Sequence, residues 1–300
     1  MLKTIWKFSR PHTIIGSILS VIVLFFLTDC SINTHLYLLI ETLIASLGCN
    51  LFITGLNQII DRDLDKINKP DLPIPAGLLT VSQAKKIVGI SLVIAIIFGV
   101  IASKVLLILI TIISFLGVIY SVPPIQLKRH HITAAWAITT VRGFLVNIGM
   151  AFHFSYSKEG NFNIIKCLIS EDVCHLPIQA IWPLTIFIIA FSISIAWYKD
   201  LHDIEGDKQF GFNTMPLLYS PRFALKMGAL VVLMAFIQSI YWFYAHHFYL
   251  QLAMFIILSI LYIINLFNIK TEDKQSIKKF YKLFWLFFFG AYMVYGSLCF

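Results

Sequence analysis

The sequence is short of charge. Asp, Glu, Lys and Arg make up 13% of its 300 residues, whereas hydrophobic residues make up 59%, and the mean hydropathy is +0.84. A typical soluble domain carries about 25% charged residues. The composition therefore excludes an ordinary soluble protein and is typical of a chain that lies largely within a membrane.

Cysteine is also scarce, and its spacing excludes a zinc framework. None of the five cysteines forms a Cys-x-x-Cys pair, and none has Cys/His spacing typical of zinc. Cys167 and Cys174 lie seven residues apart, and a disulfide between them would require an extracytoplasmic loop. We expect free thiols.

Long apolar runs fill most of the chain. Several reach the roughly 17–25 residues that a helix needs to cross a bilayer, and proline and glycine punctuate the gaps. We expect an all-α integral membrane protein with nine transmembrane helices in a single domain, 1–300. The expected spans are 13–29, 36–58, 85–103, 105–121, 132–153, 178–198, 222–243, 247–267 and 283–299.

Basic residues gather on one predicted side of the membrane. With the N-terminus in the cytoplasm, nineteen Lys and Arg lie in cytoplasmic segments, and Lys104, Lys158 and Lys166 lie on the other face. This asymmetry predicts a cytoplasmic N-terminus and an extracytoplasmic C-terminus, in the inner membrane if the source is bacterial. It also accounts for the net charge of +8 without nucleic-acid binding.

The run after Thr13 has spanning length and no cleavage pattern, so we expect a first span and not a cleaved signal. We expect an outer loop over 154–177.

Acidic residues are the scarcest charged class, and seven of the fifteen lie in two clusters that follow apolar runs. In the first, Asn57, Asp61 and Asp65 would share one helix face, and in the second Asp203 and Asp207 are again four residues apart. The predicted topology puts both clusters on the cytoplasmic side. Like charges at the rim of an apolar bundle are costly unless a cation neutralises them.

Carboxylate pairs flanked by Lys and Arg predict Mg²⁺ that bridges the protein to a diphosphate, because Mg²⁺ takes oxygen ligands and commonly uses only one or two carboxylates. The expected ligands are Asp61, Asp65, Asp203 and Asp207. Asp63 and Glu205 are expected to be solvated.

Two long motifs surround these clusters. The first is Asn57-Gln58-x-x-Asp61-x-Asp63-x-Asp65-x-x-Asn68-Lys69-Pro70-x-Leu72-Pro73, and the second is Tyr198-Lys199-Asp200-x-x-Asp203-x-Glu205-Gly206-Asp207-Lys208. They resemble the two signatures of the UbiA superfamily of intramembrane prenyltransferases. Members often have Asp where this chain has Gln58, and Asn-Gln is similar to the branch that prenylates homogentisate. The segments 120–124, 127–129 and 141–147 resemble the same branch.

The resemblance implies a UbiA-like bundle with a cytoplasmic active site. There, a prenyl group would pass from an isoprenoid diphosphate to an aromatic acceptor, homogentisate, with Mg²⁺ as cofactor, as in prenylquinone or tocopherol biosynthesis. The partners would be donor, acceptor and bilayer, with no obligatory protein partner evident. Contacts to the diphosphate oxygens would come from Lys69, Lys128, Arg129 and Lys199. The rings of Tyr120 and Tyr198 would stabilise an allylic cation.

Some assignments stay open. Asn57 would orient a ligand or the metal shell, and Asp200 is either a further ligand or a base near the acceptor. Arg142, a charge inside a span, binds the acceptor carboxylate or the diphosphate, or makes a structural ion pair; Asn147 could share its pocket. The acceptor could also be 4-hydroxybenzoate, dihydroxynaphthoate or a glycerol lipid. A cation-coupled transporter is a further alternative, although transporter carboxylates typically lie near the midplane.

Overall fold

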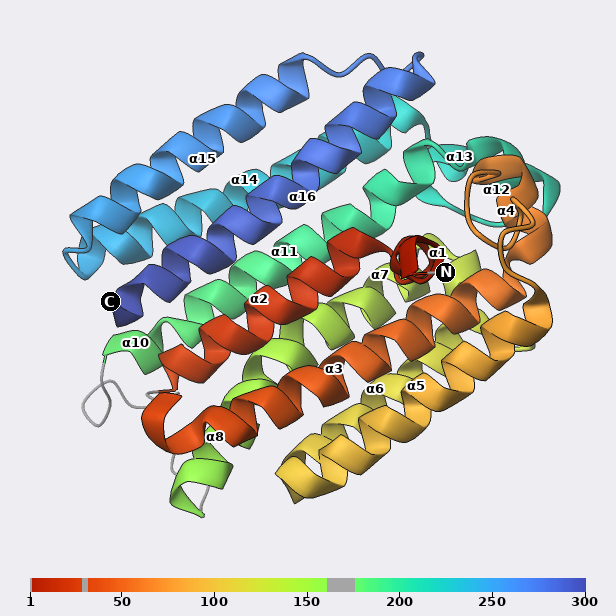
Figure 1. Ribbon diagram of the computed structural model, residues 1–300. Helices are drawn as coiled ribbons and strands as arrows, with labels where there is room; N and C mark the ends of the chain where they lie inside the picture. The colour runs from red at the N-terminus through yellow and green to blue at the C-terminus, as the bar shows by residue number, and fades with distance from the viewer. Residues whose placement is uncertain (1, 29–31, 161–175) are drawn as a thin grey trace.

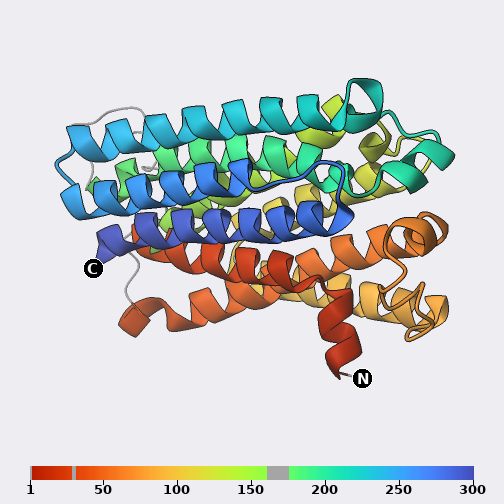
Figure 2. The same ribbon diagram turned by 90° about the horizontal axis from the view of Figure 1, so that it is seen from above.

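The computed structural model describes residues 2–28, 32–160 and 176–300, which form a bundle of long helices (Figures 1 and 2). These ranges contain no strand, so the all-α expectation is confirmed. Cys167 and Cys174 lie outside the described residues. The elements are α1 (Leu2–Phe8), α2 (Pro11–Leu27), α3 (Ile32–Ile60), α4 (Arg62–Asn68), α5 (Val81–Ala102), α6 (Lys104–Ser121), η1 (Leu127–Arg129), α7 (His131–Thr139), η2 (Thr140–Gly149), α8 (Met150–Glu159), α10 (Leu176–Gln179), α11 (Ile181–Tyr198), η4 (Lys199–Leu201), α12 (Ile204–Gln209), α13 (Met215–Leu218), α14 (Pro221–Ala245), α15 (Tyr249–Phe267), α16 (Lys274–Gly296) and η5 (Ser297–Cys299).

Each predicted span coincides with a long helical segment. Within the described ranges, eight such segments are long and apolar enough to cross a membrane. The remaining one, α2, has 17 residues, about 25 Å of helix against a hydrocarbon core of about 30 Å. An integral multi-pass protein is therefore supported, and the count of nine spans stays a prediction.

Two boundaries differ from those expected by more than four residues. Helix α16 begins at Lys274 and not at 283, because the Asp273 side chain accepts hydrogen bonds from the backbone N–H groups of Gln275 (2.9 Å) and Ser276 (3.2 Å). Such a cap stabilises a helix start, so the basic first turns remain helical. Helix α8 continues to Glu159, so the segment expected to be an outer loop from 154 begins as helix.

Helix α11 lies at the centre of the bundle and packs against α7, η2, α14 and α16. Its sequence is apolar on every side, as expected of a helix surrounded by protein. Helices α5 and α15 instead expose isoleucines such as Ile97 and Ile257, which suits contact with lipid. Helix α3 approaches α5 so closely that a Cβ on Gly48 would lie 2.8 Å from the Ser91 carbonyl oxygen.

The short elements gather at one end of the bundle. In Figure 1, α4, α12 and α13 lie together at the right-hand end, where α3 and α11 finish. Helix α1 and the start of α2 lie at the same end (Figure 2). Both acidic clusters are therefore carried by irregular segments that cap the long helices at this end.

Candidate functional site

The first acidic cluster spans a break between helices but keeps helical spacing. Helix α3 ends at Ile60, yet the N–H groups of Asp61, Asp65 and Lys69 donate to the carbonyl oxygens of Asn57 (2.9 Å), Asp61 (2.7 Å) and Asp65 (2.8 Å). Asn57, Asp61 and Asp65 therefore share a face, as their spacing predicted. Lys69 follows on the same face, and all four side chains line one cavity. Asp63 points away, is about half-exposed, and pairs with Lys66 at 2.8 Å.

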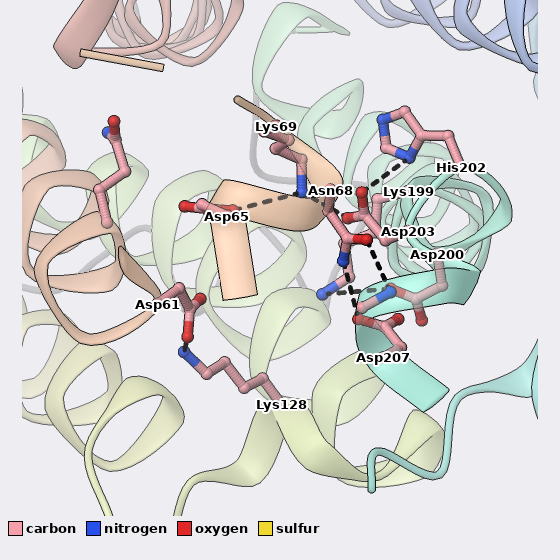
Figure 3. A network of polar contacts seen from close by, with 12 residues as sticks. Asp61, Asp65, Asn68, Lys69, Lys128, Lys199, Asp200, His202, Asp203 and Asp207 are labelled. Atoms are coloured by element: carbon pink, nitrogen blue, oxygen red, sulfur yellow. Dashed lines mark hydrogen bonds and ion pairs between the residues drawn. The ribbon is translucent and has the colours of Figure 1, made fainter. Parts of the chain in front are cut away.

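The Asn68 side chain is one of the links that hold the second cluster against the first. The N–H groups of Asp203 and Asp207 donate to the carbonyl oxygens of Asp200 (3.2 Å) and Asp203 (3.0 Å). The side-chain oxygen Oδ1 of Asn68 accepts the Gly206 N–H at 2.9 Å, and the side-chain nitrogen Nδ2 donates to Asp207 Oδ1 at 3.4 Å. A Cβ on Gly206 would lie 2.6 Å from that amide, so a side chain at this position would displace the Asn68 amide. Asn68 thus joins α4 to α12 (Figure 3).

Three lysines neutralise part of this acidic group. Lys69 pairs with Asp203 and Lys128 pairs with Asp61, each through a short contact (Figure 3). Lys199 donates to the Tyr120 hydroxyl at 2.7 Å and lies 3.7 Å from Asp200. The Lys128 side chain is only 4% exposed, so its charge is directed at the cluster and not at solvent.

The surroundings of Asp65 and Asp207 disfavour the charged forms of their carboxyl groups. Burial, followed by the charges of Asp200 and Asp203, raises the pKa of Asp207 to about 8. Burial also raises the pKa of Asp65 to about 6, against the opposing charge of Lys69. Asp65 Oδ2 is buried without a hydrogen-bond partner in the described structure. A bound cation would relieve both effects.

The donor set fits a cation that completes its coordination elsewhere. Within residues 2–28, 32–160 and 176–300, no group of three or more His, Cys, Asp or Glu side chains could hold a metal alone. This is compatible with Mg²⁺, which usually keeps several waters and binds through one or two carboxylates plus substrate phosphates. Zinc-like sites built entirely from protein ligands do not match these residues.

The clusters open into a cavity of about 290 Å³ that runs into the bundle. Its mouth is lined by Asp61, Asp65, Asp200, Asp203 and Asp207 with the three lysines, and by Asn57 and Tyr120. Its interior is mainly apolar and is lined by residues such as Val21, Ile110, Ile113, Leu116, Met150 and Phe288. The cavity therefore suits an amphipathic molecule with a charged head and a hydrocarbon tail.

One wall of the mouth is cationic and aromatic. The Arg142 guanidinium carbon lies 4.8 Å from the ring centroid of Trp285, and the His12 ring lies 4.7 Å from the same indole. Arg142 belongs to the π-helix η2, in which the Asn147 amide donates to the carbonyl oxygens of Arg142 (3.0 Å) and Gly143 (2.7 Å). Arg142 has no carboxylate partner in the described ranges, so the alternative of a structural ion pair finds no support.

Two predicted site residues lie outside the cavity. Tyr198 is fully buried, and its hydroxyl contacts the Tyr262 hydroxyl (3.1 Å) and the Leu225 carbonyl (3.2 Å). The exposed Arg129 side chain donates to the Phe210 carbonyl at 2.9 Å. The structure therefore places both side chains away from the cavity, because neighbouring residues in a helix point in different directions. Asn147 is likewise buried behind the wall and lines no part of the cavity.

The cavity also recruits residues that no motif indicated. Arg10, His12, Asn50, Tyr281 and Trp285 line it. Asn50 is tied to α2 by bonds to the Ser17 hydroxyl (2.7 Å) and the Thr13 hydroxyl (3.0 Å). The sequence offered one signal for these positions, which is a basic or polar residue within or beside an apolar run. That signal does not tell which face of the helix meets the cavity.

Comparison with known proteins agrees with this architecture. The model of the UbiA prenyltransferase family matches residues 17–289. A homogentisate phytyltransferase from Synechocystis sp. is 35% identical, with 98% of this chain and 94% of the relative covered. A chloroplastic homogentisate solanesyltransferase from Arabidopsis thaliana is 33% identical, with 98% and 76% covered.

Solved structures share the fold at lower identity. A UbiA homologue from Archaeoglobus fulgidus, bound to GPP and Mg²⁺, superposes with a TM-score of 0.64 at 16% identity, covering 98% of this chain and 99% of the other. A digeranylgeranylglyceryl phosphate synthase gives a TM-score of 0.63 at 19% identity, with 99% and 98% covered. At these identities the likeness concerns the fold.

Proposed function

Because the chain belongs to the UbiA prenyltransferase family, we propose that it transfers a prenyl group from an isoprenoid diphosphate to homogentisate. We further propose that residues 1–300 form one membrane domain for this reaction. The observation that carries the proposal is the cavity, whose mouth combines five carboxylates with three lysines and whose interior is apolar. The homogentisate prenyltransferases among the relatives support this choice of acceptor.

The donor diphosphate would bind at the mouth together with Mg²⁺. Asp61, Asp65, Asp203 and Asp207 would hold the cation, and the unpartnered Asp65 Oδ2 and the raised pKa of Asp207 support this assignment. The solved homologue bound to GPP and Mg²⁺ has the same fold. When bound, Mg²⁺ would neutralise the diphosphate oxygens and so make the diphosphate a better leaving group.

The lysines would act on the donor by exchanging partners. Lys69 and Lys128, which pair with Asp203 and Asp61, would donate to diphosphate oxygens once those carboxylates bind Mg²⁺. Lys199 already lies between Tyr120 and Asp200, and we assign Asp200 to orienting it. Asn57, whose amide donates to the Ser121 hydroxyl at 3.3 Å, would keep its carbonyl oxygen available to the site.

The acceptor would lie against the aromatic wall. Arg142 would bind its carboxylate while the Trp285 ring holds the guanidinium in place. The carbon–oxygen bond of the donor would break and release diphosphate, a ring carbon of the acceptor would bond to the allylic carbon, and the ring proton would pass to the released diphosphate. The Tyr120 ring would face the developing cation, and the apolar interior would exclude water that competes with the acceptor.

We place this site on the cytoplasmic side, with a cytoplasmic N-terminus and an extracytoplasmic C-terminus, in the inner membrane if the source is bacterial. The support is the distribution of Lys and Arg along the sequence. A transporter is disfavoured because the carboxylates lie at one end of the bundle, as Figure 1 shows for α4 and α12.

The test is a reconstituted assay. Purified protein in lipid nanodiscs, with Mg²⁺, labelled geranylgeranyl diphosphate and homogentisate, is expected to release diphosphate and form a prenylated product, and EDTA is expected to stop both. A parallel panel of 4-hydroxybenzoate, dihydroxynaphthoate and a glycerol lipid identifies the acceptor. Absence of product with every acceptor and donor length would overturn the proposal.

A further inference from the structure

The proposed reaction assigns no role to His12, although this side chain lines the cavity. His12 lies in the first turn of α2, at the end of the bundle where both acidic clusters lie (Figure 2). Its ring contacts the indole of Trp285, with centroids 4.7 Å apart. Among the residues that the structure describes, its two ring nitrogens have no hydrogen-bond partner. Because polar groups in a protein interior are usually paired, this ring is available to bind a ligand.

The turn that carries His12 is held in place by its neighbours. Arg10, just before the helix, has a left-handed backbone (φ 54°) that few residues other than glycine adopt. The Thr13 N–H and hydroxyl both donate to the Arg10 carbonyl oxygen, at 2.8 and 2.9 Å. The same hydroxyl lies 3.0 Å from the side-chain oxygen of Asn50 on α3. His12 therefore has a defined position between α3 and the buried Trp285 of α16.

His12 is the nitrogen group of this wall that can accept a hydrogen bond. The guanidinium of Arg142 and the indole N–H of Trp285 can only donate, and Trp285 Nε1 is buried without a hydrogen-bond partner in the described ranges. A neutral imidazole has one acceptor nitrogen. Arg10 and Arg142 line the same cavity. A third positive charge beside them is disfavoured, so the His12 ring is expected to be neutral.

We propose that His12 accepts a hydrogen bond from a phenolic hydroxyl of the acceptor while Arg142 binds the acceptor carboxylate. The inference rests on the proposed function, and it makes His12 a specificity-determining residue. A phenol with a carboxylate presents an anion, which needs donors, and an O–H group, which needs an acceptor. Arg142 and His12, both packed on Trp285, supply one of each. The substrate class is therefore a hydroxyaryl acid, and an acid without the hydroxyl leaves the ring nitrogen unpaired.

The experiment measures binding of the acceptor, so that differences in ring reactivity between analogues do not enter. Nanodiscs with Mg²⁺ and an unreactive thiodiphosphate analogue of the donor are titrated by calorimetry with homogentisate, 2-hydroxyphenylacetate and 3-hydroxyphenylacetate. Each of the last two lacks one hydroxyl of homogentisate. For the wild-type protein, one of them is expected to bind about ten-fold more weakly than homogentisate, which is the effect of one lost hydrogen bond. Dissociation constants within about two-fold for all three acids would overturn the inference.

Two substitutions isolate the ring nitrogen of His12. His12→Phe keeps a ring against Trp285 and removes the acceptor, so homogentisate is expected to bind about ten-fold more weakly and to lose its advantage over the weaker analogue. His12→Gln restores an acceptor, and the advantage is expected to return to about three-fold or more. The matched control is His246→Phe, because the His246 ring also stacks on a tryptophan (Trp242, centroids 4.4 Å apart) but lines no part of the cavity.

Other hydroxyls on this wall give the inference a direct competitor. Tyr281 and Tyr292 also line the cavity, and the Tyr292 hydroxyl already donates to Asn147 at 2.9 Å. Tyr281→Phe is therefore measured in parallel. An advantage of homogentisate that is lost in Tyr281→Phe and kept in His12→Phe would overturn the inference, and so would an equal loss in His246→Phe.

The outcomes separate this inference from the proposed function. If His12→Phe does not fold, as judged by thermal unfolding, His12→Ala takes its place, because it also lacks the acceptor. Prenylated product in the reconstituted assay, together with an unchanged preference for homogentisate in the His12 variants, would refute the role of His12 alone. Absence of product with every acceptor would instead refute the proposed function.

Discussion

Replacing Asp61 by asparagine separates the catalytic role of this carboxylate from its structural one. The substitution keeps the shape of the side chain but removes a proposed ligand of Mg²⁺. Even outer partners of a metal ligand cost about 10–100-fold when mutated, so the expected loss in kcat/KM is at least about 100-fold. The matched control is Asp63→Asn, two residues away, because Asp63 is 54% exposed and pairs with surface groups. Its activity is expected to stay within about two-fold of wild type.

Asp61→Asn also has a structural cost that can be cancelled. Lys128 is 4% exposed and would lose its carboxylate partner. Removing one member of a buried pair costs about 3–5 kcal/mol, and since the Asp61 side chain is 12% exposed at the cavity mouth, we expect about 2–3 kcal/mol. The double variant Asp61→Asn with Lys128→Met removes both charges, so stability is expected to return while activity does not.

The assay pairs thermal unfolding in nanodiscs with Mg²⁺ titration of diphosphate release. The apparent Mg²⁺ requirement is expected to rise in Asp61→Asn and to stay unchanged in Asp63→Asn. The reasoning fails if Asp61→Asn retains activity similar to that of Asp63→Asn. It also fails if the double variant regains activity together with stability, because the carboxylate would then serve only to balance Lys128.

Three further substitutions test other parts of the site. Tyr198→Phe is expected to lose about 1 kcal/mol of stability with wild-type activity, because its hydroxyl contacts Tyr262; a large fall in kcat would contradict this. Arg142→Lys, which removes the planar group stacked on Trp285, is expected to raise KM about ten-fold for a carboxylate acceptor and not for an analogue without the carboxylate. Asn68→Ala, which leaves the Gly206 N–H unpaired, is expected to cost about 1–2 kcal/mol and to raise the Mg²⁺ requirement; an unchanged requirement would show that the contact does not position the carboxylates.

The sequence was sufficient to predict the features that depend on local periodicity. The shared face of Asn57, Asp61 and Asp65 followed from their four-residue spacing, and it survives the helix break because the backbone hydrogen bonds continue through Asp61. Glu205 lies at the surface as expected, where it pairs with Lys274 at 2.8 Å. Composition and helix length were likewise enough to predict the all-α membrane fold.

The sequence was insufficient where the site depends on how helices pack. Tyr198 and Lys199 are neighbours in the chain, yet one faces α14 and α15 and the other faces the cavity. His12 and Trp285 meet at the cavity wall although about 270 residues separate them. No local pattern encodes such a meeting. The π-helical segment that carries Arg142 was also missed, since its stabilising contact comes from the side chain of Asn147.

The formal charges of the side chains that line the cavity are balanced. Among the described residues that line the cavity, five carboxylates face five side-chain cations, namely Arg10, Lys69, Lys128, Arg142 and Lys199. The two sets are formally equal, so a diphosphate entering alone would leave several negative charges uncompensated in a partly buried place. A diphosphate that enters with Mg²⁺ adds little net charge. Each paired carboxylate can then exchange its lysine for Mg²⁺, and each lysine can exchange its carboxylate for a diphosphate oxygen. The five carboxylates and the five cations therefore form one formally neutral set, and we propose that this balance makes the binding of donor and of Mg²⁺ depend on each other.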